Sequence, residues 1–413
     1  HYLIILSFTN FYILFVMNEK VTHQHLIQFT NVLRSFLGSN FLVMPFAFAQ
    51  AGVLGAIVIL LIVTSITYYC CDLLISIKRE HSNSTAPLDT FGKVGGAVMG
   101  EWIIYWIDIL IIFTQVGFCI SYSVFMGTSI IRLFPNISLQ ISFILVGVCV
   151  LPFVLIRDVT NLAYTSALSS ILLLLGMCGC ITFFDFHWEY TFEYKLIHWD
   201  MVMVIFGMCT ASFEGIGLVI PVEDSFQGKF ESNPYIPMLK IAITLASTVL
   251  ILFGYGGFLT FGDKSNSVLT VNLPPDSPLG ILIGYCFCVA IYFSYPLQMY
   301  PAVVTIEKHL HIKFADSKWC ITHFYNIGIA IRIFLVCLTM LVGYFVPEYG
   351  LIGAVIGSLG SASLTYILPP LFHLKNSKSN SWTWNTIVDI ILISFGSLLT
   401  TTGTFSSIKE IIN

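Results

Sequence analysis

The sequence predicts an all-α polytopic membrane protein with about eleven transmembrane helices. Hydrophobic residues make up 57% of the 413-residue chain and charged residues only 10%, whereas soluble chains carry roughly 25% charged residues. Apolar stretches recur along the whole chain, and about 20 consecutive apolar residues are enough to cross a bilayer. The polar stretches between them are short, so we expect no soluble domain.

The spans are expected to follow one another closely. Residues 1–25 form an N-terminal segment, and we leave 1–16 out of the fold prediction because the chain starts with His1 and Met17 is an equally good start. From the apolar runs, the spans are expected at roughly 26–50, 53–77, 101–133, 137–156, 160–184, 200–227, 235–261, 278–305, 322–345, 350–371 and 383–407.

Lysine and arginine residues in the loops predict the orientation of the chain. With the N-terminus in the cytoplasm, eleven of these residues fall in cytoplasmic loops and four in outside loops. Because the cytoplasmic loops of membrane proteins carry an excess of basic residues, we expect a cytoplasmic N-terminus.

Two of the expected spans contain a polar and flexible interruption. In the first span, Gly38-Ser39-Asn40 is followed by Pro45, and in the sixth span Glu214 stands among apolar residues and glycines. An interrupted helix frees backbone N–H and C=O groups, which cannot face lipid but can face a cavity that holds a polar substrate. Glycines that merely allow helices to pack closely are the alternative explanation.

These segments resemble the amino acid/auxin permease family, and within it the proton-coupled small amino acid transporters. The matching stretches are RSFLGSNFLVMPFAFAQAG (34–52), FEGIGLVIPVED (213–224), YFSYPLQMYPAV (292–303) and GSLGSASLTYILPPLF (357–372). The turn of the first span departs from the family, because the usual Gly-x-Gly is replaced by Gly38-Ser39-Asn40.

The resemblance implies an inverted repeat of two five-helix halves, with an eleventh helix after them. The halves would be 26–184 and 200–372, and 383–413 would hold the last helix and a short outside tail. The implied function is secondary active transport of small neutral amino acids by alternating access, coupled to protons. A sodium-coupled carrier and an amino acid sensor with little transport are the alternatives. Family members lie in the plasma membrane or in lysosome-like membranes.

The two interruptions supply the predicted substrate site. We expect backbone amides at Gly38, Ser39 and Asn40 to bind the substrate carboxylate, because the N-terminal end of a half-helix is positively polarised. Carbonyl groups of the sixth span would bind the substrate ammonium. The remaining candidates are Phe213 as an aromatic lid, Gly215 and Gly217 in the sixth span, and Ser294 and Tyr295 in the eighth. Core packing is the alternative for Phe213, and hydrogen bonding between helices for Ser294 and Tyr295.

Four ionisable residues in or near the spans have candidate roles. Glu214 is the candidate for proton coupling, since ionisable residues inside a membrane are functional by default; capping of freed backbone N–H groups is its alternative. Arg34 and Glu223 are candidates for an inner gate, with snorkelling of Arg34 and solvation of Glu223 as alternatives. Arg332 is expected to snorkel.

Other classes of function find no support in the sequence. It contains no metalloprotease motif, no phosphate-binding loop and no repeated filter, so neither an enzyme nor a channel is predicted. The net charge of −4 argues against nucleic-acid binding. We expect no cofactor and no metal, and the sequence does not indicate an oligomeric state.

Overall fold

The computed structural model describes residues 29–30, 32–81, 88–157, 159–186, 201–213, 215–224, 235–274, 276–314, 318–377 and 383–412. These residues contain helices and no strand. Within them, nine helices are long and apolar enough to cross a membrane, and two shorter apolar helices, Asn40–Ala51 and Leu139–Val154, lie at the first and fourth predicted spans. The predicted all-α polytopic class is therefore confirmed.

The helical elements follow the predicted order of spans. They are η1 (Ser39–Val43), α3 (Met44–Ala51), α4 (Val53–Glu80), α5 (Phe91–Met99), α6 (Trp102–Leu133), α7 (Leu139–Val154), α8 (Val159–Phe186), α9 (Val202–Ser212), α10 (Ile216–Asp224), α11 (Tyr235–Phe261), η2 (Gly262–Lys264), α12 (Leu269–Asn272), α13 (Pro278–Lys313), α14 (Lys318–Phe345), α15 (Tyr349–Val355), η3 (Ile356–Ser361), η4 (Ser363–Ile367), α16 (Leu368–Asn376), α17 (Trp384–Leu398), η5 (Leu399–Gly403) and α18 (Thr404–Ile412).

Several helices begin at side chains that cap them. The hydroxyls of Ser138, Ser277 and Thr383 accept hydrogen bonds from backbone N–H groups of the first turns of α7, α13 and α17. Such caps satisfy N–H groups that have no partner inside the helix. Gly52, with φ of 76°, makes the sharp turn between α3 and α4 that an L side chain would resist.

Both predicted interruptions are present in the structure. Residues 32–36 are helical, 37–38 are not, and a 3₁₀ turn, η1, leads into α3. In the sixth span α9 ends at Ser212 and α10 begins at Ile216. The helices are thus broken where the sequence places glycines and polar groups.

The tenth and eleventh spans contain π-helical stretches that the sequence analysis did not predict. In the tenth, η3 and η4 lie between α15 and α16, and in the eleventh η5 lies between α17 and α18. A Cβ atom added at Gly357 of η3 would lie 1.8 Å from the carbonyl oxygen of Gly207 in α9. The backbones of η3 and α9 are therefore in direct contact.

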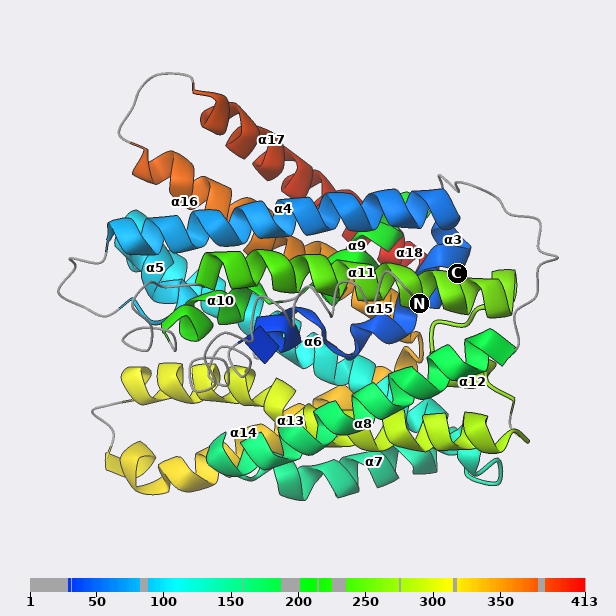
Figure 1. Cartoon of the computed structure of the whole chain (residues 1–413). Helices are drawn as coiled ribbons and strands as arrows, with labels where there is room; N and C mark the ends of the chain where they lie inside the picture. Colours follow the sequence, from blue (N-terminus) through cyan, green and yellow to red (C-terminus); the bar gives the residue numbers. More distant parts are fainter. Residues whose placement is uncertain are drawn as a thin grey trace, which may run out of the picture.

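Burial separates central helices from peripheral ones. Within the sixth span, Val202–Asp224, 82% of the most apolar 18 residues are buried, and within the tenth, Tyr349–Asn376, the corresponding share is 72%. The share is only 28% in Ala167–Asp185 and in Trp384–Ile412. Figure 1 shows the long helices running in roughly one direction, with α17 at one edge and α7 at the opposite edge. The broken sixth helix therefore lies in the centre of the bundle.

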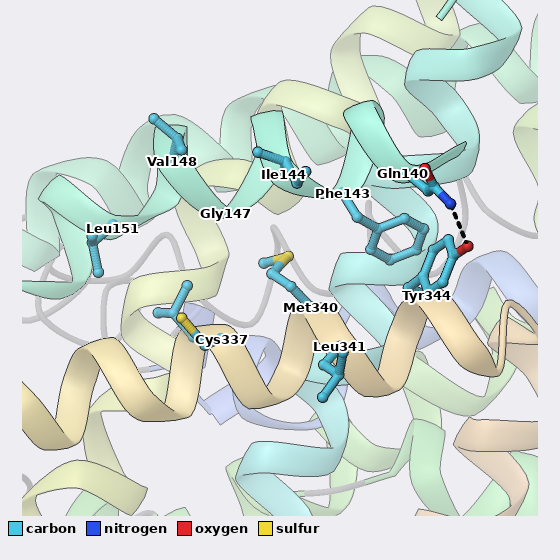
Figure 2. Close-up of a pocket in the computed structure, with 11 residues that line it drawn as sticks. Gln140, Phe143, Ile144, Gly147, Val148, Leu151, Cys337, Met340, Leu341 and Tyr344 are labelled. Atoms are coloured by element: carbon cyan, nitrogen blue, oxygen red, sulfur yellow. Dashed lines mark hydrogen bonds between the residues drawn. The ribbon is translucent and has the colours of Figure 1, made fainter. Parts of the chain in front are cut away.

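An apolar groove of about 420 Å³ runs between α7 and α14. Figure 2 shows that its side chains come from both helices and that Gln140 bonds Tyr344 at one end, at 3.1 Å. Ile144, Val148 and Leu341 along it are exposed. An exposed apolar surface of this kind is expected where a membrane protein contacts lipid.

Candidate functional site

The two helix interruptions meet at Asn40. Its side-chain amide donates a hydrogen bond to the backbone carbonyl oxygen of Ala211 at 3.1 Å. The backbone carbonyl oxygen of Asn40 accepts a hydrogen bond from the Ser212 hydroxyl at 3.4 Å. The Tyr349 hydroxyl donates to the Asn40 side-chain oxygen at 3.2 Å. Asn40 therefore joins the first, sixth and tenth spans.

Open space adjoins two of the predicted glycines. Among the residues that the structure describes, a Cβ atom added at Gly38 or Gly217 would find no neighbouring heavy atom within 4 Å. Gly38 has φ of −82° and ψ of −178°, an extended conformation that any residue can adopt. A Cβ at Gly215, by contrast, would lie 2.5 Å from the ring of Phe36. Gly215 thus permits close packing, whereas Gly38 and Gly217 border space.

The other predicted site residues with described side chains are engaged with neighbouring helices. Phe213 is 1% exposed and belongs to the apolar core. The hydroxyls of Ser294 and Ser169 lie 2.5 Å apart, which joins α13 to α8. The hydroxyl of Tyr295 lies 2.5 Å from that of Thr339, which joins α13 to α14. These contacts match the packing and interhelical alternatives stated for these residues.

Two predicted residues cannot be placed by their side chains. Glu214 lies outside the described residues, and for Ser39 only the backbone is described, as the first residue of η1. Arg34 lies on the helical turn before the first interruption, and its side chain is exposed. Their predicted roles stay predictions.

Glu223 takes part in a partly buried ion cluster between α10 and α4, in which Glu223 and Lys78 are buried and Arg79 is exposed. Its carboxylate lies 2.8 Å from the guanidinium of Arg79 and 3.3 Å from the ammonium of Lys78. Lys78 also contacts Asp224, at 2.5 Å. Because Glu223 is only 2% exposed, solvation at the membrane face is the wrong interpretation for it. The cluster ties the second half of the broken helix to the end of α4.

Arg332 does not snorkel, and that expectation is wrong. Its side chain is 3% exposed and forms an ion pair with Glu307 of α13, while also donating to the carbonyl oxygen of Gly328 at 3.0 Å. Because α13 supplies a carboxylate beside it, the guanidinium is neutralised inside the protein.

Sequence reasoning missed the carboxylate of Asp389. It is buried in α17 beside His373 of α16 and Tyr69 of α4. A second such pair joins Asp108 of α6 to His309 of α13, at 2.8 Å. An aspartate inside an apolar span does indicate a buried carboxylate in the sequence. Its partners lie on other helices, so the sequence of its own span does not identify them.

Comparison with known proteins gives a consistent picture. A family model described as "Transmembrane amino acid transporter protein" matches residues 24–409. The chain is 28% identical to the amino acid transporter AVT3B of Arabidopsis thaliana, covering 93% of this chain and 92% of that protein. It is also 28% identical to the vacuolar amino acid transporter 4 of Saccharomyces cerevisiae, covering 89% of this chain and 56% of that protein.

Proposed function

We propose that this chain, which belongs to the transmembrane amino acid transporter family, carries small neutral amino acids by alternating access, together with a proton. Family membership confirms the family that the sequence motifs predicted. The relatives named above are transporters, and the chain is a multi-pass membrane protein. The substrate class, the proton and the mechanism are our proposal.

The observation that carries the proposal is the meeting of two interrupted helices beside open space. The first backbone N–H groups of η1 have no partner within that helix, and they lie next to Gly38. Such N–H groups suit a carboxylate, and we propose that carbonyl oxygens at the end of α9 bind the ammonium. An amino acid carries both groups on one carbon, so the two breaks match its common part.

Side chains around the interruptions support a small substrate. Phe36 fills the space beside Gly215, and Asn40 is held by Ala211 and Tyr349. Open space is found at Gly38 and Gly217 instead. A bulky side chain on the substrate would have to displace packed groups, which is costly in a close-packed interior.

We further propose that the protein works in the membrane of an acidic compartment. One relative is named as a vacuolar transporter, and a membrane with a standing pH difference supplies protons as the driving ion. The two halves, 26–184 and 200–372, would rearrange around the interruptions. The ion pairs of Glu223 with Lys78 and Arg79 would break and re-form on the side of the membrane where α4 ends.

Uptake by purified protein in liposomes tests the proposal. Labelled glycine, alanine and proline are offered with and without a pH gradient, and sodium is replaced by choline throughout. We expect uptake that needs the gradient and not sodium. Uptake that requires sodium would favour a sodium-coupled carrier, and binding without uptake would favour a sensor.

A further inference from the structure

A buried carboxylate joins three helices at the end of the molecule where α4 and α16 finish and α17 begins (Figure 1). Asp389 of α17 is 0% exposed. One of its oxygens lies 2.5 Å from Nδ1 of His373 in α16, and the other accepts a hydrogen bond from the Tyr69 hydroxyl of α4 at 3.3 Å. The eleventh, tenth and second spans therefore share this one group.

The partners of Asp389 differ from those of the other buried or half-buried carboxylates at this end. Glu223 has Arg79, Glu307 has Arg332, and Asp108 has Lys308 at 3.6 Å in addition to its histidine. Each of those carboxylates faces a permanent cation. In the part of the chain that the structure describes, the partners of Asp389 are an imidazole and a phenol.

This difference matters because an uncompensated charge inside a membrane protein is costly. A carboxylate that accepts Nδ1–H from a neutral imidazole leaves the pair with one net negative charge. A proton added at Nε2 converts the imidazole to imidazolium, and the pair becomes neutral without breaking its hydrogen bond. The His373 side chain is 27% exposed, so a proton can reach it.

Groups on the packed elements complete the electrostatic surroundings. From α4, Cys70 and Glu80 lie near the pair and Asp72 lies near Tyr69, and Glu80 accepts a hydrogen bond from Asn376. From α5, Lys93 pairs with Asp89 at 2.8 Å. From η4, the Tyr366 hydroxyl lies 3.1 Å from that of Thr210 in α9. The nearby acids favour a further proton.

We propose that Asp389, His373 and Tyr69 form a proton-binding site that takes up one proton on His373. That this proton uptake is coupled to amino acid transport rests on the proposed function. The site is connected to the broken sixth helix by two elements that contact it. One is the π-helical η3–η4 stretch, which precedes α16 and contacts α9 at Gly357 and Tyr366. The other is α4, which carries both Tyr69 and the cations that hold Glu223.

The titration of His373 is measured directly on the whole protein in lipid nanodiscs. Protein labelled with ¹⁵N-histidine is titrated between pH 5 and 8 by NMR, and His373→Gln identifies the resonance. We expect the His373 signal to change from neutral to doubly protonated within this range. A signal that stays in one protonation state would overturn the site.

The coupling is measured as the pH profile of alanine uptake in liposomes. In His373→Gln and Asp389→Asn, we expect uptake to lose its dependence on the pH of the solution that bathes the His373 end of the protein. His309→Gln is the matched control, since its carboxylate keeps Lys308, and it should retain the wild-type profile. A wild-type profile in both His373→Gln and Asp389→Asn would overturn the coupling. If wild-type protein carries no amino acid, the proposed function fails, and the NMR titration decides the proton site.

Discussion

At the scale of single residues, Asn40 occupies the position in the turn of the first span where the family usually has a second glycine. Its side chain does not fill the open space beside Gly38, because it is held between α9 and Tyr349. The sequence predicted that Asn40 belongs to the site. It could not predict these partners, because Ala211 and Tyr349 are brought to Asn40 only by the fold.

Replacement of Asn40 by alanine is predicted to lower stability. Two hydrogen bonds between spans are lost, each worth about 1 kcal/mol in a typical protein. The thermal midpoint of the purified protein in detergent should therefore fall. Asn326→Ala, at an exposed position, serves as the control and should leave the midpoint unchanged. Equal midpoints for the two variants would mean that Asn40 does not hold the spans together.

Replacement of Gly38 by valine is predicted to impair transport and not folding. The backbone angles at Gly38 suit any residue, and an added Cβ atom has no heavy atom of the described residues within 4 Å. We expect a normal thermal midpoint together with a raised KM or a loss of uptake. Gly284→Ala is the control, with its nearest atom 3.9 Å from the added methyl group. Wild-type uptake by a folded Gly38→Val protein would remove Gly38 from the substrate site.

At the scale of elements, the interrupted helices were predictable and the π-helical stretches were not. Glycine, proline and polar residues inside an apolar run mark an interruption in the sequence itself. The π-helical η3 instead accompanies a tertiary contact, the approach of its backbone to Gly207. Likewise, the pairing of His373 with Asp389 depends on how α16 and α17 pack. Such contacts cannot be read from a single segment.

Replacement of Gly357 by valine is predicted to prevent correct assembly of the sixth and tenth spans. The added Cβ would lie 1.8 Å from the carbonyl oxygen of Gly207, and a backbone atom cannot move aside as a side chain can. We expect a loss of about 3 kcal/mol or more, seen as aggregated protein in size-exclusion chromatography. Gly353→Ala, four residues earlier, should remain monodisperse, because no atom of the described part of the chain lies within 4 Å of the added methyl group. A monodisperse and equally stable Gly357→Val protein would contradict the contact.

At the scale of the whole molecule, burial places the interrupted sixth span at the centre and the eleventh at the edge. Composition and length predicted the apolar spans, of which the described residues contain nine long helices and two shorter ones, because apolar runs of sufficient length are a direct requirement of the bilayer. They do not report which spans are central, since both kinds are equally apolar. The proposed substrate site is therefore central and the proposed proton site more peripheral, and the tenth span connects them.

Substrate-dependent proton entry tests this account most directly. Liposomes that contain the purified protein and a trapped pH indicator are placed in medium of lower pH, without sodium, and alanine is added. We predict that alanine accelerates acidification of the interior by wild-type protein and not by folded Gly38→Val protein. Alanine uptake with no change in the rate of proton entry would contradict proton-coupled transport through the interrupted helices.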